Sequence, residues 1–104
     1  MSLSIIASST MVESGYGLDT RGEITWLPLS GRLNDYWGVH KLFTSDADDA
    51  YLEQGYPSDI WEFSMEKVKK MQELDNINNY GAEVTEFLAR IVESGAEKIY
   101  IKVV

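Results

Sequence analysis

His40 is the natural starting point in a search for catalysis, because imidazole alone among the side chains ordinarily titrates near neutral pH. It is the single histidine of the chain. A nucleophile beside it would need a suitable motif, and Leu29-Ser30-Gly31 lacks the glycine–serine–glycine spacing of a nucleophile elbow. The sequence therefore assigns no catalytic residue, favours a binding protein over an enzyme, and leads us to expect a structural or solvent-facing His40.

A second catalytic spacing joins Ser64 to Lys67, three residues later. Penicillin-binding enzymes use a serine and a lysine at this spacing, but their companion motifs are missing from this chain. Serine is also a preferred residue at the start of a helix, where its hydroxyl accepts a backbone N–H bond. We therefore predict that Ser64 caps a helix.

Metal and cofactor motifs also fail on their spacing. A calcium loop counted from Asp46 has Tyr51 where glycine is needed and Pro57 where a bidentate glutamate belongs. The Gly15-x-Gly17 pair lacks the third glycine of a dinucleotide fingerprint, because Thr20 stands there. Cysteine, the usual zinc thiolate, is absent. We expect no metal and no cofactor.

The most distinctive segment is acidic and aromatic. Between Lys41 and Lys67 there is no basic residue, and seven acids account for nearly all of the net charge of −8. The acids are Asp46, Asp48, Asp49, Glu53, Asp59, Glu62 and Glu66, and the aromatic residues among them are Phe43, Tyr51, Tyr56, Trp61 and Phe63. Trp61 and Phe63 are expected in the core, whereas Tyr51 and Tyr56 are expected at the surface.

Tyrosine anchors surrounded by acids are typical of a surface that attracts and holds a basic partner. The predicted binding face consists of Asp49, Tyr51, Glu53, Tyr56 and Asp59. The first functional prediction is a small protein-binding domain of the immunity or inhibitor type, which neutralises a basic protein through this face. Its resemblance to immunity proteins is one of size, charge and absence of cysteine, and no motif of such a family is present.

Two alternatives from other classes stay open. One is a small-molecule-binding or enzymatic domain with a pocket near Trp26, Trp37 and His40. The other is a structural homo-oligomer, in which strand 98–103 is an open edge that pairs between two copies. An acidic ridge with exposed tyrosines would favour the protein partner, and a deep pocket that holds His40 would favour the ligand.

Composition restricts the partners further. A length of 104 residues and a 44% hydrophobic content suit one domain, residues 1–104, with one modest core. The strongly negative charge disfavours nucleic acid and anionic membranes, both of which bind through clustered lysine and arginine. No apolar run is long enough to span a bilayer. With cysteine absent as well, we expect a soluble cytoplasmic protein.

The first half of the chain predicts strands. Residues 3–13 and 23–29 are separated by a glycine-rich turn and should pair as a hairpin. Pro28 has no backbone N–H and should end its strand or lie at a sheet edge. Residues 39–43 are predicted as a third strand.

The second half predicts helices before a final strand. A helix should begin at Ser45, with Asp48 completing a capping box, and should end at Gly55 and Pro57. Residues 59–63 fit either a strand or the first turn of the helix that follows Ser64. Further elements are a helix over 82–94 with an apolar face and an alternating strand over 98–103. The predicted fold is α+β (or α/β), with a hairpin or three-stranded antiparallel sheet, two to three helices packed on it, and strand 98–103 joining the sheet.

Overall fold

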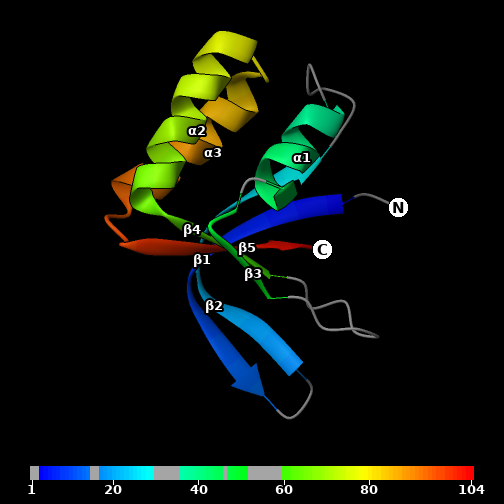
Figure 1. Cartoon of the computed structure of the whole chain (residues 1–104), viewed down its shortest axis with the longest axis vertical. Coiled ribbons are helices and arrows are strands. Elements are labelled where there is room, and N and C mark those ends of the chain that lie inside the picture. Colours follow the sequence, from blue (N-terminus) through cyan, green and yellow to red (C-terminus); the bar gives the residue numbers. More distant parts are fainter. Residues whose placement is uncertain (1–2, 15–16, 30–35, 46, 52–59) are drawn as a thin grey trace.

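The structure is a computed structural model, and it describes residues 3–14, 17–29, 36–45, 47–51 and 60–104. Within these residues, five strands form one antiparallel sheet and three helices lie on one side of it (Figure 1). The strands are β1 (Leu3–Ser14), β2 (Gly17–Leu29), β3 (Asp49–Tyr51), β4 (Ile60–Ser64) and β5 (Lys98–Val103). The helices are α1 (Tyr36–Ser45), α2 (Met65–Asn78) and α3 (Ala82–Glu93). The predicted α+β class is confirmed.

Strand β5 occupies the middle of the sheet, whose order is β2-β1-β5-β4-β3. Its residues pair with residues 5–8 of β1 on one side and with residues 60–64 of β4 on the other. The prediction that strand 98–103 is an open edge is therefore wrong, and so is the homodimer predicted through it. Both rows of its backbone groups are already bonded within the chain, and the two edges of the sheet are β2 and β3.

The core lies between the sheet and the helices. Alternate residues of β5, Ile99 and Ile101, are fully buried on the helix side. From α3, the side chains of Val84, Phe87, Leu88 and Ile91 are buried too, as the periodicity of residues 82–94 predicted. Aromatic rings join the layers, because Phe43 of α1 makes edge-to-face contacts with Phe87 at 5.3 Å and with Phe63 of β4 at 6.4 Å between centroids.

Helix α1 corrects two predictions. Residues 39–43, predicted as a strand, are helical, and their apolar members Val39, Leu42 and Phe43 are all buried. Because these three residues are spaced i, i+3 and i+4, they share one helix face, which packs on the sheet. The helix predicted to begin at Ser45 is also wrong, since α1 ends there and the chain continues into strand β3.

The helix predicted after Ser64 is confirmed as α2, and the ambiguous segment before it is strand β4. The Ser64 hydroxyl accepts the backbone N–H of Lys67 at 3.2 Å, so the serine–lysine spacing is that of a helix cap. At the other end of α2, the buried carboxylate of Asp75 accepts the Thr85 hydroxyl of α3 at 2.6 Å. This hydrogen bond ties the two helices together.

The β1–β2 hairpin is confirmed, but it is longer than predicted. Residues 17–22, predicted as part of the turn, belong to strand β2. Beyond residue 8, β1 pairs with β2 alone, so residues 9–14 and 17–22 form an arm that projects below the sheet in Figure 1. The register shifts between Ala7 and Ser8, which accommodates an extra residue of β2 where the arm leaves the sheet. Pro28 lies on edge strand β2, as its missing N–H predicted.

Replacing Phe87 with alanine should lower the free energy of unfolding by about 3–5 kcal/mol, because it removes buried ring area and leaves a cavity beside Phe43. Urea unfolding at neutral pH measures this loss. Glu93→Ala, at an exposed position at the end of the same helix, should stay within about 0.5 kcal/mol of wild type. A Phe87→Ala loss as small as that of the control would mean that this helix face is not part of the core.

Gly22 combines a left-handed backbone, with φ of +73°, with a close neighbour, since a Cβ added there would collide with the Ser9 hydroxyl. Gly95 has nearly the same φ, +72°, but open space around it. Gly95→Ala should therefore cost only the left-handed penalty of about 1–2 kcal/mol. Gly22→Ala should cost more in the same urea titration, and equal losses would show that the Ser9 side chain moves away freely.

Candidate functional site

Two residues of the predicted binding face, Asp49 and Tyr51, lie on the side of the sheet opposite the helices. Asp49 and Tyr51 of β3 pair with Glu62 and Ile60 of β4, and partners in a sheet share one face. The Tyr51 hydroxyl donates a hydrogen bond to Glu62 Oε1 at 3.3 Å. We call Asp19, Asp49, Tyr51 and Glu62 the acidic face. Sequence reasoning had assigned Glu62 to the acidic segment but not to the binding face.

The strand register extends this face across the whole sheet. One row of cross-strand partners runs from β2 to β3 and holds one residue of each strand. The row consists of Glu23, Ser8, Tyr100, Glu62 and Asp49. Because the neighbours of Tyr100 along β5 are buried under the helices, Tyr100 and its row point to the opposite side. Acids therefore stand at both ends of the row.

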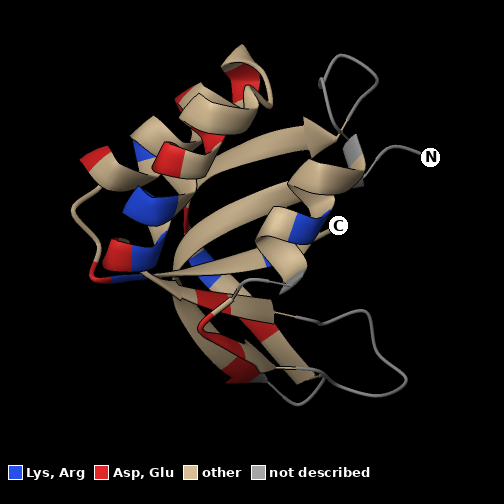
Figure 2. Cartoon of the chain, turned by 45° about the horizontal axis from the view of Figure 1, so that its top comes forward, with Lys and Arg blue, Asp and Glu red and all other residues tan. Residues whose placement is uncertain are grey.

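Both lysines of β5 on this side are already paired with acids. Lys102 Nζ lies 3.0 Å from Asp19 Oδ1 of the arm, and this hydrogen bond is the main reason that the pKa of Asp19 is lowered. Lys98 Nζ lies 3.8 Å from Glu62 Oε2. Within the described residues Asp49 makes no ion pair, and its carboxylate accepts only the backbone N–H of Ala50 at 2.8 Å. Figure 2 shows acidic positions on the lower strands and on the arm of the molecule.

Tyr51 is placed to act as a hydrogen-bond donor. Its partial burial, followed by the negative charges of Glu62 and Asp49, raises the pKa of the Tyr51 phenol. The hydroxyl therefore keeps its proton well above neutral pH. The other members of the predicted face, Glu53, Tyr56 and Asp59, lie outside the described residues, so their part in the face stays a prediction.

Asp48 has a structural task other than the predicted one. It does not cap a helix that begins at Ser45. Instead, its Oδ2 accepts the backbone N–H of Ser64 at 2.7 Å, and its own N–H donates to the Glu62 carbonyl at 2.9 Å. These bonds hold the chain before β3 against the junction of β4 and α2.

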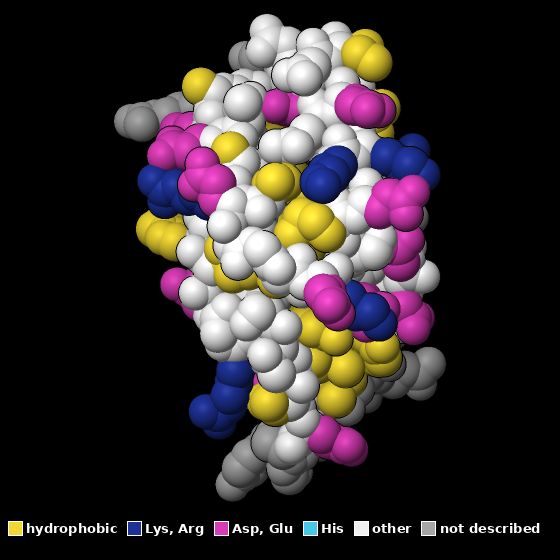
Figure 3. Space-filling model, turned by 90° about the vertical axis from the view of Figure 1, so that its left-hand side faces the viewer, with side chains coloured by type: hydrophobic (Ala, Val, Ile, Leu, Met, Phe, Trp, Pro, Cys, Tyr) yellow, Lys and Arg dark blue, Asp and Glu magenta, His cyan; other side chains and the backbone are white. Residues whose placement is uncertain are grey.

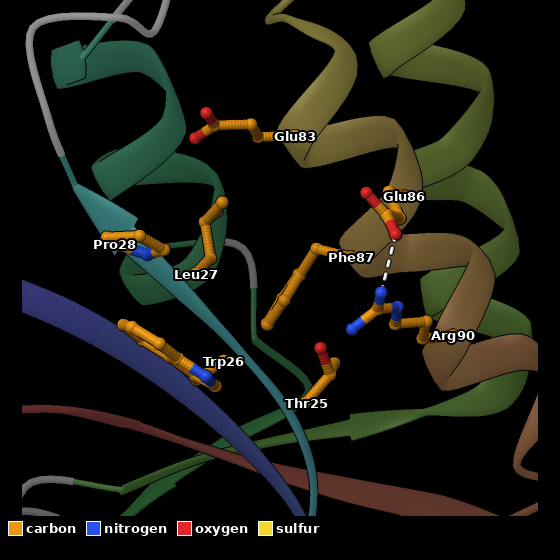
Figure 4. Close-up of a pocket in the computed structure, with 8 residues that line it drawn as sticks. All are labelled: Thr25, Trp26, Leu27, Pro28, Glu83, Glu86, Phe87 and Arg90. Atoms are coloured by element: carbon orange, nitrogen blue, oxygen red, sulfur yellow. Dashed lines mark hydrogen bonds and ion pairs between the residues drawn. The ribbon is translucent and has the colours of Figure 1, made fainter.

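A pocket of about 240 Å³ lies between edge strand β2 and helix α3 (Figure 4). Its lining combines apolar and charged side chains: Thr25, Trp26, Leu27, Pro28, Glu83, Glu86, Phe87 and Arg90. In Figure 4, Phe87 and Leu27 lie between the helix and the strand, whereas Trp26 lies on the far side of β2. Arg90 is bound to Glu86 at 2.6 Å. No ion pair joins Glu83 to another described residue.

The predicted alternative site is divided between separate places. Trp26 lines the pocket beside α3, but neither Trp37 nor His40 does. Those two residues lie together on α1, with ring centroids 6.1 Å apart, and Trp37 is 74% exposed. The pocket volume is also below the roughly 300–1,000 Å³ that holds a typical small ligand. The small-molecule or enzymatic prediction gains no catalytic residue from this arrangement and stays a prediction.

Sequence reasoning missed the charged residues of the pocket. The i, i+4 spacing of Glu86 and Arg90 was visible, and the ion pair it predicts is present. Their position beside β2 is a consequence of tertiary packing between segments about 60 residues apart, for which a single sequence gives no local signal.

Comparison with known proteins gives no match to a protein-family model, a curated protein or a solved structure. The described helices include none that is long and apolar enough to cross a membrane. Among the same residues, acids and histidine do not gather in a group of three or more that could hold a metal ion. The acidic face and the β2–α3 pocket are therefore the two candidate sites of this chain.

The bond from Ser64 to Asp48 predicts a pH-dependent contribution to stability. This bond, as the largest cause, holds the pKa of the Asp48 carboxyl below its ordinary value. Because the pKa of Asp48 is lower in the folded than in the unfolded protein, the bond contributes its full stability above the unfolded-state pKa of about 3.9. This contribution is lost as the pH falls through the lower pKa of the folded state.

Asp48→Ala should therefore lower the free energy of unfolding by about 1 kcal/mol at pH 7, a modest value because the carboxylate is exposed. The difference from wild type should shrink in urea titrations near pH 3. Asp49→Ala is the control, since among the described residues its carboxylate bonds only the adjacent Ala50. A difference for Asp48→Ala that does not change with pH would show that the bond is not made by the ionised form.

Proposed function

We propose that this chain is a protein-binding domain whose acidic face recognises a basic surface on another protein. The observation that carries the proposal is the unbalanced charge on the open side of the sheet. Lys98 and Lys102 are each bound to an acid of the same face, and among the described residues the exposed Asp49 makes no ion pair. A lysine or arginine of a partner would complete this arrangement.

The aromatic side chains beside the acids of this face would slow dissociation of such a partner. Tyr51 and Tyr100 are both partly exposed on the open side of the sheet, next to the acids. Tyrosine buries a large area with little loss of conformational freedom, and its hydroxyl adds a hydrogen bond. Charge determines mainly how fast partners meet, while well-packed aromatic anchors determine mainly how slowly they separate.

The rest of the molecule supports the same choice of partner. A net charge of −8 attracts positively charged proteins over a distance of about one Debye length, 8–10 Å at physiological salt. A basic protein held on the acidic face has its cationic surface covered, so it can no longer bind an anionic substrate there. The proposed activity is thus that of a stoichiometric inhibitor, of the immunity or inhibitor type, and it requires no catalytic group.

The test begins with capture of a positively charged protein on the immobilised domain, from a lysate of the cells that make it. Asp49→Lys should slow association with that protein by about tenfold at low ionic strength and should weaken its salt dependence. Tyr51→Ala should mainly hasten dissociation. Surface plasmon resonance at about 0.01 M and 0.15 M ionic strength separates the two effects.

Glu93→Lys is the matched control, because it makes the same change in net charge at an exposed position on α3. It should alter association much less than Asp49→Lys does. If both reversals slow association equally, the attraction comes from total charge and not from the acidic face. If neither reversal matters, or if no basic protein is captured, the proposed function is wrong.

A further inference from the structure

The two edges of the sheet differ in a way that the acidic face does not explain. Edge strand β3 has three residues and carries Asp49, and a short, charged edge is a common protection against pairing with another chain. Edge strand β2 is longer, and its residues 24–29 contain no charged side chain. Trp26 stands in the middle of this stretch with 56% of its surface exposed.

The register shows where the backbone groups of this edge point. Ser4 exchanges two backbone hydrogen bonds with Val104, N–H to C=O in each direction and each 2.8 Å long. The N–H and C=O of one strand residue point to the same side, so Ser4 has none left for its β2 partner, Pro28. Pro28 therefore directs its carbonyl away from β1. By alternation Trp26, two residues earlier, directs both its N–H and its C=O outward as well.

The side chains beside this edge offer different chemistry on its two faces. Toward the helices lies the β2–α3 pocket, with Glu83 and the Glu86–Arg90 ion pair on its α3 wall. On the other face Trp26 presents an apolar ring. On the flank of the molecule seen in Figure 3, hydrophobic side chains lie next to both acidic and basic ones. A strand added to β2 would direct alternate side chains to these two environments.

We propose that the outer edge of β2 binds an extended peptide segment of a partner protein, in which apolar residues alternate with lysine or arginine. The outward N–H and C=O of Trp26 would pair with the backbone of the segment. Its apolar side chains would pack on Trp26, and its basic side chains would enter the pocket toward Glu83. This docking edge uses the backbone of β2, Trp26 and Glu83, and none of the four residues of the acidic face takes part in it.

Charge complementarity selects a basic segment over a second copy of this chain. Arg90 is bound to Glu86, and no other described residue forms an ion pair with the carboxylate of Glu83, so Glu83 is the pocket charge offered to a basic side chain of the segment. Two copies would each bring a net charge of −8 to the contact. In antiparallel self-pairing centred on Trp26, Pro28 would also face a carbonyl of the other copy without an N–H to donate.

The experiment screens a displayed library of random heptapeptides against the immobilised full chain. Enriched sequences should alternate apolar and basic residues, and the strongest is then synthesised as the probe for calorimetry. Trp26→Ala and Glu83→Lys should each weaken probe binding by about tenfold or more. Trp37→Ala is the matched control, because it removes another exposed tryptophan from α1. It should leave binding unchanged.

Methylated probes test the backbone pairing directly. N-methylation of alternate probe residues removes either the N–H groups that face β2 or those that face away. One methylated set should lose binding and the other should retain it. Asp49→Lys should bind the probe as wild type does, so failure of the acidic face and failure of this docking edge are distinguishable.

Four outcomes would overturn the proposal. They are a library without enrichment over a blank surface, equal losses for Trp26→Ala and Trp37→Ala, and methylated sets that behave alike. The fourth is a dimer in sedimentation velocity that Trp26→Ala dissociates, since the edge would then belong to a second copy. Because Trp26 is largely exposed, its alanine variant should fold, and circular dichroism confirms that each variant tested is native.

Discussion

Burial of the helix-side face of the sheet is the constraint on which the other features depend. The helix-side face carries Ile5, Ala7, Ile99 and Ile101, all fully buried, and α3 covers it with a regular apolar stripe. Because strand side chains alternate, the same strands must present their other residues to the opposite side. Tyr100, Glu62 and Asp49 are there for that reason. The acidic face is thus the complement of the core.

Elements with a regular local pattern could be predicted from the sequence. Helix α3 and strand β5 each repeat their apolar positions several times. The pattern of α3 therefore fits only a helical period of about 3.6 residues, and that of β5 fits only the two-residue period of a strand. Helix α1 failed this test, because residues 39–43 are too short a run to separate a helix from a strand. The capping prediction at Ser45 failed for another reason. The Asp48 carboxylate instead accepts the backbone N–H of Ser64, 16 residues away, and rules based on neighbouring residues cannot predict such a bond.

The candidate sites were predictable in part for the same reason. Asp49 and Tyr51 were assigned to a binding face from their types alone, and their association with Glu62 needed the β3–β4 pairing. The β2–α3 pocket combines residues near 25 with residues near 86, so only the folded chain shows it. The order of the strands likewise depends on partners far apart in sequence. Because of that order, residues 98–103 lie at the centre of the sheet and not at the expected edge.

The central position of β5 also has a consequence for the order in which the sheet can form. Residues 5–8 can pair with β2, which follows closely in the sequence, but their other edge has no partner until residues 100–103 join it. Without β5, the sheet would be divided into two strand pairs, β1–β2 and β3–β4, each with an unpaired inner edge. Joining them is a late, long-range step whose loop-closure entropy slows folding. Before that step the unpaired inner edges are open to other chains, so aggregation competes with folding at this stage.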